Sequence, residues 1–262
     1  MNRIERVFEK LKRSKKKAFI AFITAGYPNL SITRELILEF AKSGVDIIEL
    51  GIPFSDPMAD GLIIQEASQK ALDNKVNIND VLRMVKKLRQ SIDIPICFMT
   101  YYNPIFCFGE ERFLSMARDS GVDGIIIPDF PPEEGKSFMR FAHRFNVDTI
   151  FFIAPTTNIK RMEFISKTAK GFIYYVSLTG VTGPRLSLPP DLVHSVKLVK
   201  KIVKKPVCVG FGISTPRQVR QIFEIADGVI VGSAIIKKIK ENIGKPDLVK
   251  RVGAFVRSLM RV

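Results

Sequence analysis

The chain has few of the residues from which metal sites and disulfide frameworks are built. Its three cysteines, Cys97, Cys107 and Cys208, are an odd number, lack C-x-x-C spacing and lie in or beside apolar stretches. Reduced structural thiols therefore explain them better than disulfides or metal ligands. The two histidines, His143 and His194, lie far apart in helix-like segments, so we expect no metal site and no histidine-based triad.

The chain also lacks a long apolar run. No stretch approaches the roughly 18 residues that a membrane span needs, so we expect no membrane segment. The basic N-terminus is not read as a signal peptide, because residues 1–13 predict an amphipathic helix that packs. The apolar positions of that helix follow i, i+3, i+4, i+7 spacing: Ile4, Val7, Phe8 and Leu11. We expect a cytoplasmic protein.

Negative charge is scarce relative to positive charge. The 41 Lys and Arg residues exceed the 26 Asp and Glu residues, and the net charge is +15. The basic residues are spread over helix faces without interleaved aromatics or a nucleic-acid-binding motif, so we expect no nucleic-acid partner. Solvated helix faces explain them better, and a mild attraction for an anionic substrate is compatible with this charge.

A weak internal repeat organises the chain. A helix-like segment ends, a Gly or Asn supplies a left-handed cap, an Asp follows, and an apolar run begins. The pattern occurs at Gly44-Val45-Asp46, Gly121-Val122-Asp123, Asn146-Val147-Asp148 and, without the left-handed cap, Ala226-Asp227-Gly228. Each copy predicts the passage from a helix into a strand.

The apolar runs are continuous rather than alternating, as in parallel strands covered on both faces. Strands are expected to begin near residues 18, 46, 94, 124, 148, 172, 206 and 228. Amphipathic helices are expected at 33–43, 78–91, 190–203 and about 247–260, and Thr215-Pro216 predicts an N-cap followed by proline at the first helical position.

Eight β-α units in one chain predict a (β/α)8 TIM barrel forming a single domain over residues 1–262. We expect an extra N-terminal helix and extra helices in the βα-loops after strands 2 and 8. A doubly wound open sheet is the structural alternative.

The segment from Glu49 to Gly61 carries the first chemical signal. Glu49 ends the apolar run 45–50, and Asp60 lies in the following loop. A buried carboxylate without a partner is costly, so an acid here is either paired for structural reasons or functional. Capping a backbone group or pairing with a lysine is the structural alternative. Two acids in different environments at a strand's C-terminal end are typical of acid–base chemistry.

Glycines follow the later strands. Gly210-Phe211-Gly212 comes after the seventh expected strand, and Gly232-Ser233 comes after the eighth. Backbone N–H groups approach a phosphate closely where no Cβ intervenes, and a helix N-terminus favours the anion. A dinucleotide fingerprint fails because Thr215 stands at the third glycine position. The pattern therefore predicts a phosphate site.

The chain resembles the alpha subunit of tryptophan synthase over almost its whole length. The most specific match is the run ELGIPFSDPMADG, from Glu49 to Gly61. Further matching segments are Thr24 to Pro28, Tyr102-Asn103-Pro104, Pro128-Asp129, Gly180 to Gly183, Gly210 to Ser214 and Gly232-Ser233. The chain departs from the family at Leu62-Ile63-Ile64, where members commonly place Pro and a small residue.

The resemblance implies a carbon–carbon lyase that splits indole-3-glycerol phosphate into indole and glyceraldehyde 3-phosphate without a cofactor. It implies catalytic roles for Glu49 and Asp60. It also implies substrate contacts from Phe22, Tyr174, Thr182, Gly183, Phe211, Gly212, Gly232 and Ser233. Residues 53–61 and 178–190 would be mobile lids, and a beta subunit would receive the indole in an α2β2 tetramer.

Other functions stay open on the sequence. One is a stand-alone lyase that releases free indole, and another is a catalytically idle barrel that activates a partner. A phosphate-binding isomerase of the same fold is weaker, because no Lys or His electrophile is evident. Retention of both Glu49 and Asp60 favours the active lyase.

Overall fold

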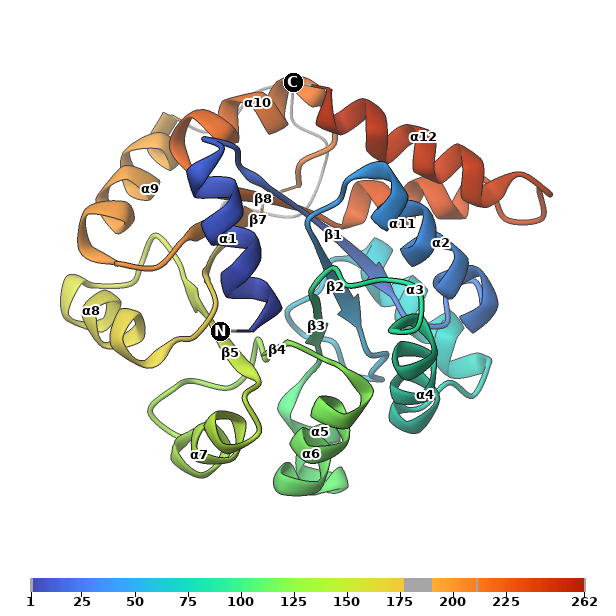
Figure 1. Cartoon of the computed structure of the whole chain (residues 1–262), viewed down its shortest axis with the longest axis horizontal. Coiled ribbons are helices and arrows are strands. Elements are labelled where there is room, and N and C mark those ends of the chain that lie inside the picture. The colour runs from blue at the N-terminus through green and yellow to red at the C-terminus, as the bar shows by residue number, and fades with distance from the viewer. Residues whose placement is uncertain (1, 177–189, 211, 262) are drawn as a thin grey trace.

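The computed structural model describes residues 2–176, 190–210 and 212–261, which form a closed parallel barrel surrounded by helices (Figure 1). The strands pair with their neighbours in chain order, and the last strand pairs with the first. They are β1 (Ala18–Thr24), β2 (Ile47–Gly51), β3 (Ile96–Met99), β4 (Gly124–Ile126), β5 (Asp148–Ile153), β6 (Ile173–Val176), β7 (Val207–Gly210) and β8 (Gly228–Val231).

The helices are α1 (Arg3–Arg13), α2 (Leu30–Ser43), α3 (Leu62–Asp73), α4 (Ile78–Leu88), α5 (Tyr102–Phe108), α6 (Glu110–Ser120), α7 (Lys136–Arg144), α8 (Ile159–Thr168), α9 (Pro190–Ile202), α10 (Pro216–Ile225), α11 (Ser233–Lys240) and α12 (Leu248–Met260). Helix α1 precedes the first strand, α2 to α10 connect successive strands, and α11 and α12 follow the last strand. The predicted (β/α)8 barrel with an extra N-terminal helix is confirmed.

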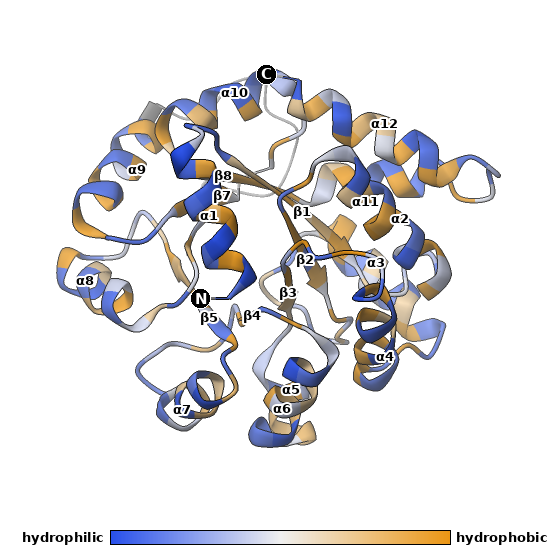
Figure 2. Ribbon diagram, in the orientation of Figure 1, coloured by the Kyte–Doolittle hydropathy of each residue, from blue (hydrophilic) through white to orange (hydrophobic). Residues whose placement is uncertain are grey.

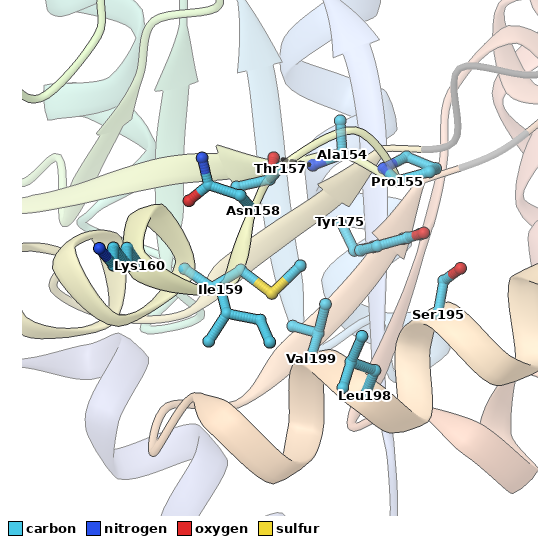
Figure 3. A pocket seen from close by; sticks show the side chains of 11 residues that line it. Ala154, Pro155, Thr157, Asn158, Ile159, Lys160, Tyr175, Ser195, Leu198 and Val199 are labelled. Atoms are coloured by element: carbon cyan, nitrogen blue, oxygen red, sulfur yellow. Dashed lines mark hydrogen bonds between the residues drawn. The ribbon is translucent and has the colours of Figure 1, made fainter.

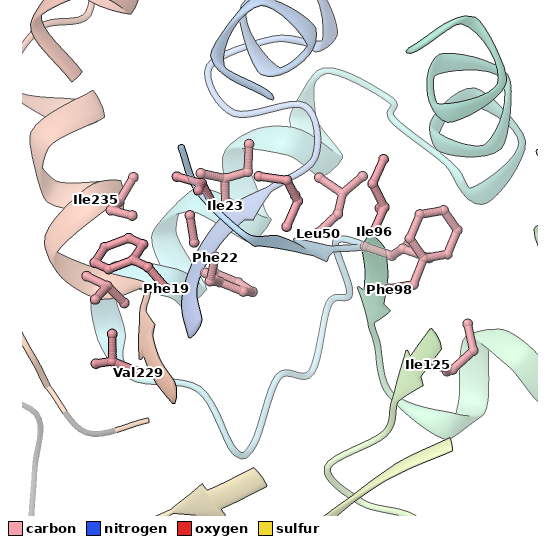
Figure 4. Close-up of a cluster of buried hydrophobic side chains, with 14 of the residues drawn as sticks. Phe19, Phe22, Ile23, Leu50, Ile96, Phe98, Ile125, Val229 and Ile235 are labelled. Atoms are coloured by element: carbon pink, nitrogen blue, oxygen red, sulfur yellow. The ribbon is translucent and has the colours of Figure 1, made fainter. Parts of the chain in front are cut away.

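Two apolar cores follow from the alternation of side chains along each strand. Phe19 and Ile23 of β1 point outward and pack with Leu50 of β2 and Ile235 of α11 in the layer between barrel and helices (Figure 4). Ile20 points inward. Figure 2 shows the same division, with apolar strands at the centre and helices whose outer faces are hydrophilic.

The inner core fills the N-terminal half of the barrel and is closed by α1. Ile4, Phe8 and Leu11 of α1 are buried against inward side chains such as Ile20 and Cys208. The amphipathic N-terminal helix expected from the sequence therefore packs across one end of the barrel. The C-terminal ends of the strands lie at the other end of the barrel, and a functional site is expected there.

The repeated Asp before a strand has a definite structural task. Asp46, Asp123 and Asp227 stand just before β2, β4 and β8. Their carboxylates accept hydrogen bonds from backbone N–H groups of the preceding strand, at Phe19 (2.8 Å), Ile96 (2.9 Å) and Val207 (3.0 Å). The left-handed caps before two of them are also confirmed, because Gly44 and Gly121 both have φ 89°.

The connection after β3 differs from the expectation, because it carries an additional short helix, α5, before α6. The N–H of Tyr102, at the start of α5, donates to the Asp129 carboxylate over 3.0 Å. Asp129 lies 27 residues further along the chain, so no local pattern announces this cap. The extra helices after β2 and β8 are present as predicted.

The three thiols are free; Cys97 and Cys208 are buried in the inner core, whereas Cys107 is exposed and so is not the structural thiol that its apolar surroundings in the sequence suggested. No helix in the described ranges is long and apolar enough to cross a membrane.

Asp123 provides a stability test. Its carboxylate is 1% exposed, lies 2.8 Å from the Arg89 guanidinium and also contacts Arg3. Because Asp123→Ala leaves the Arg89 charge buried and unpaired, we expect the free energy of unfolding to fall by about 3–5 kcal/mol. Urea unfolding measures the loss.

The matched control is Asp93→Ala, since Asp93 pairs with the same Arg3 but its side chain is 72% exposed. This variant should lose less than about 1 kcal/mol. Equal losses in the two variants would contradict the importance of the buried pair.

Candidate active site

Glu49 lies inside the barrel near its open end. It is two residues after Ile47, which belongs to the inner core, so the alternation of β2 turns the Glu49 side chain inward as well. Its neighbours in register are Phe22 on β1 and Cys97 on β3. The residue is 0% exposed. The prediction that this acid lies in a buried strand is confirmed, but β2 continues two residues beyond Glu49, to Gly51.

The Glu49 carboxyl group has no compensating partner among the described residues. Within the described residues, neither oxygen accepts or donates a hydrogen bond. Structural pairing with a lysine or a backbone group is therefore absent from this part of the chain. Burial raises the pKa of Glu49 to about 8, and the nearby Asp60 carboxylate adds to the shift. At neutral pH this group carries its proton.

Asp60 is held at the barrel mouth by Tyr101. The Tyr101 hydroxyl donates to the Asp60 carboxylate over 3.1 Å and accepts from the N–H of Ala59 over 2.9 Å. Gln65 binds the Asp60 carbonyl over 2.8 Å. Burial raises the pKa of Asp60 to about 6, and the hydrogen bond from Tyr101 opposes that shift. Asp60 is consequently ionised at neutral pH, whereas Glu49 is not.

Two threonine hydroxyls accompany the acids. Thr24 and Thr100 line a small cavity of ≈ 10 Å³ together with Asp60 and Tyr101. Neither hydroxyl has a partner in the described part of the chain. A cavity of this size holds about one water molecule. The sequence did not single out Tyr101, Thr24 or Thr100 as individual site residues; Thr24 only opens a run that matches the family.

Phe22 and Tyr174 form aromatic walls that require glycine neighbours. A Cβ at Gly51 would lie 2.9 Å from the Phe22 ring, and one at Gly232 would lie 3.1 Å from it. A Cβ at Gly210 would lie 2.7 Å from the Tyr174 ring. Both aromatic residues therefore occupy space that side chains on neighbouring strands would fill. Burial, followed by the charges of Glu49 and Asp60, raises the pKa of the Tyr174 phenol.

The helix N-termini after β7 and β8 differ in how they are capped. At α10, the Gln218 side chain accepts the N–H groups of Ser214 (2.9 Å) and Thr215 (3.1 Å). At α11, Gly232 is the N-cap and no side chain caps the helix, so the N–H groups around Ser233 remain available. Such an uncapped N-terminus suits an anion.

Gly212, the other predicted phosphate contact among the described residues, has φ 45° and open space where a side chain would begin. Thr182, Gly183 and Phe211 lie outside the described residues, as does nearly all of the expected second lid. The structure brings Glu49, Asp60, Phe22, Tyr174, Gly232 and Ser233 to the C-terminal end of the barrel.

Acid–base chemistry is what this arrangement can perform. Two carboxyl groups with different raised pKa values face one site, beside aromatic walls and an uncapped helix N-terminus. Among the described residues, no cluster of three His, Cys, Asp or Glu side chains could hold a metal ion.

A closed (β/α)8 barrel with this site is of the class of barrel enzymes that act by acid–base chemistry. Comparison with known proteins gives the family. Residues 8–261 match the family described as tryptophan synthase alpha chain, and the chain belongs to it. It is 44% identical to the tryptophan synthase alpha chain of Thermoanaerobacter sp. (strain X514) over 262 residues, covering 100% of both chains.

Solved structures agree. The crystal structure of tryptophan synthase subunit alpha from Legionella pneumophila str. Paris is 41% identical, with a TM-score of 0.92, covering 99% of this chain and 97% of that one. The tryptophan synthase α2β2 complex from the hyperthermophile Pyrococcus furiosus provides a chain 37% identical, with a TM-score of 0.88, covering 94% of this chain and 98% of that one.

The raised pKa of Glu49 makes stability depend on pH. The pKa is about 8 in the folded protein against 4.5 ordinarily, so between these values the folded protein binds more protons than the unfolded chain. Stability from this group is fully present below the lower value and falls as pH rises, by at most about 1.4 kcal/mol per pH unit. Above the higher value both states are ionised and the loss is complete.

Glu49→Gln does not titrate and escapes this loss. We therefore expect the variant to gain stability over the wild type by a margin that grows from about pH 5 to about pH 8 and is then constant. Urea unfolding of both proteins across this range measures the margin. A margin independent of pH would show that Glu49 has an ordinary pKa.

Proposed function

We propose that Glu49 and Asp60 are the catalytic groups with which this chain splits indole-3-glycerol phosphate into indole and glyceraldehyde 3-phosphate. The chain is a carbon–carbon lyase by its membership of the tryptophan synthase alpha chain family. The observation that carries the residue assignment is the pair of carboxyl groups at the barrel mouth, one neutral and one ionised at neutral pH. The reaction needs one group of each kind.

Glu49 moves the proton. Cleavage of the bond between indole C3 and the glycerol carbon requires a proton at C3 and removal of a proton from the adjacent hydroxyl. A neutral Glu49 gives its proton to C3, and the resulting carboxylate then takes the hydroxyl proton as the bond breaks. The aldehyde and indole leave, and Glu49 is again neutral. A pKa near neutrality suits a group that must both donate and accept a proton.

Asp60 stabilises charge. Protonation at C3 places positive charge on the indole ring nitrogen, and an ionised carboxylate that accepts the ring N–H stabilises it. Tyr101 supports this role, because its hydrogen bond favours the ionised form of Asp60 and fixes its position. Tyr101 is a positioning residue in this proposal.

The remaining site residues bind the two ends of the substrate. Phe22 and Tyr174 would flank the indole, and the N–H groups around Gly232 and Ser233 at the start of α11 would bind the phosphate. Gly212 would contribute to the phosphate site from the β7 side. By the family resemblance, Thr182, Gly183 and Phe211 would complete the pocket.

A beta subunit is the proposed partner, in an α2β2 assembly like that of the Pyrococcus furiosus protein. Large apolar side chains are exposed on the loops and helices that follow β2 and β3, beside the site. Met58 is 81% exposed, Leu62 70% and Phe106 66%. Exposed apolar residues gathered at one end of a barrel are typical of a protein interface. Leu62 stands where the family commonly has another residue.

The activity test is indole release from indole-3-glycerol phosphate, with and without a beta subunit. Glu49→Gln should lower kcat about 10²- to 10⁴-fold, the usual contribution of general acid–base catalysis. KM should change little, since the amide keeps the size of the side chain. If Glu49→Gln kept activity within about tenfold of wild type, Glu49 would not be the general acid–base group.

Asp148→Asn is the matched control. Asp148 is also a buried acid, and burial raises its pKa to about 6, but it stands at the N-terminal end of β5, away from the mouth. We expect the kcat of the Asp148→Asn variant to stay within about twofold of wild type, because Asp148 performs no acid–base step.

The partner surface is tested by Phe106→Ala. Truncation of an exposed aromatic anchor should weaken binding of the beta subunit at least tenfold, or about 1.4 kcal/mol, measured by calorimetric titration. Ile243→Ala is the control, since Ile243 is 47% exposed but follows the far end of α11. Equal weakening by both variants, or by neither, would place the interface elsewhere.

A further inference from the structure

A second cavity lies outside the barrel wall, between α8 and α9. Its volume is ≈ 520 Å³, within the range of pockets that hold small ligands. Figure 3 shows Ile159 of α8 facing Leu198 and Val199 of α9, with Tyr175 of β6 extending toward Ser195 of α9. The residues of the candidate active site do not line this cavity.

The walls are apolar and accessible. Ile159 is 53% exposed and Leu198 is 37% exposed, which is high for large aliphatic side chains. Met162 and Val199 form the deeper part and are buried. Branched aliphatic and methionine side chains around a hollow suit a flat ring, which they contact on both faces.

The cavity also contains one buried polar anchor. Tyr174 points into the barrel, so the alternation of β6 turns Tyr175 outward, and Tyr175 is 0% exposed. The Ser195 hydroxyl acts on the Tyr175 oxygen as a hydrogen-bond donor. No acceptor for the Tyr175 hydroxyl proton is found among the described residues. Figure 3 shows the hydroxyl directed toward Ser195 at one side of the cavity. A buried hydroxyl proton without an acceptor is unfavourable, and an acceptor on a ligand would relieve it.

Charge around the cavity selects the ligand further. No Asp or Glu is among the residues that line it, whereas Lys160 lies at its rim. The first turn of α8, with Asn158 as N-cap, also faces it, and a helix N-terminus is positive. These features disfavour a cation and favour an anion.

We propose that the cavity between α8 and α9 binds a small aromatic carboxylate, whose ring lies among Ile159, Met162 and Leu198 and whose carboxylate accepts from Tyr175. Ser195 is the second hydroxyl within reach of that carboxylate. Lys160 attracts the anion from the rim. The site is separate from the proposed lyase activity and does not depend on it.

Direct binding of 2-naphthoate to the full chain tests the site. The chain contains no tryptophan, so the fluorescence of the naphthoate ring is observed with little protein background. We expect saturable one-to-one binding with a Kd below about 1 mM, which corresponds to about 4 kcal/mol. Absence of saturable binding at millimolar concentration would overturn the proposal.

Two matched variants locate the ligand. Ile159→Tyr fills part of the cavity and should weaken binding at least tenfold, and it keeps the chain free of tryptophan. Phe164→Tyr adds the same side chain to the same helix at a residue that is 40% exposed but does not line the cavity, and it should leave binding unchanged. Unchanged binding in Ile159→Tyr would place the ligand elsewhere, for example at the barrel mouth, and would overturn the proposal.

Tyr175→Phe tests the anchor by removing one hydroxyl. Affinity for 2-naphthoate should fall about fivefold. Affinity for 2-methylnaphthalene, which lacks the carboxylate, should not fall. The urea midpoint of the free protein should change little, because among the described residues the hydroxyl loses only its contact with Ser195. Unchanged naphthoate affinity, or a clearly lower urea midpoint, would contradict a hydroxyl reserved for a ligand.

Discussion

The structure depends on one unfavourable burial: a carboxyl group inside a closed barrel without a partner in the described residues. Glu49 is tolerated there because it can remain protonated, which avoids the cost of a buried charge. The closed strands exclude water, and the aromatic ring of Phe22 covers the neighbouring position on β1. Asp60, on a loop with a hydrogen bond from Tyr101, stays ionised nearby. The two acids therefore differ because Glu49 is the more deeply buried and is also raised by the Asp60 charge, whereas the hydrogen bond from Tyr101 opposes the effect of burial on the pKa of Asp60.

Much of the fold could be predicted because its signals are local. Continuous apolar runs indicate strands covered on both faces, and the left-handed Gly before an Asp marks where a helix ends. The hydrogen bonds of Asp46, Asp123 and Asp227 to the preceding strand explain why that Asp recurs. The location of Glu49 in the second strand could be predicted for the same reason, although the strand extends to Gly51 rather than ending at the acid.

The rest of the site depends on contacts between distant segments. Tyr101 binds Asp60 across 41 residues, and Asp129 caps α5 across 27 residues, so neither role has a signature of its own in the sequence. Phe22 meets Gly51 and Gly232 only because β1 lies between β2 and β8 in the closed barrel. The choice of α11 over α10 for an anion likewise rests on the Gln218 side chain, which occupies the α10 terminus.

The helix α1 closes one end of the barrel and leaves the other end for the site. Ile4, Phe8 and Leu11 close the N-terminal end, so among the described residues the interior next to Glu49 is blocked on that side. In the proposed reaction, indole formed beside Glu49 would leave at the opposite end, past Met58, Leu62 and Phe106, the exposed apolar side chains that the proposed beta subunit would cover. A helix remote from the proposed catalytic groups would thereby direct a product toward the partner protein.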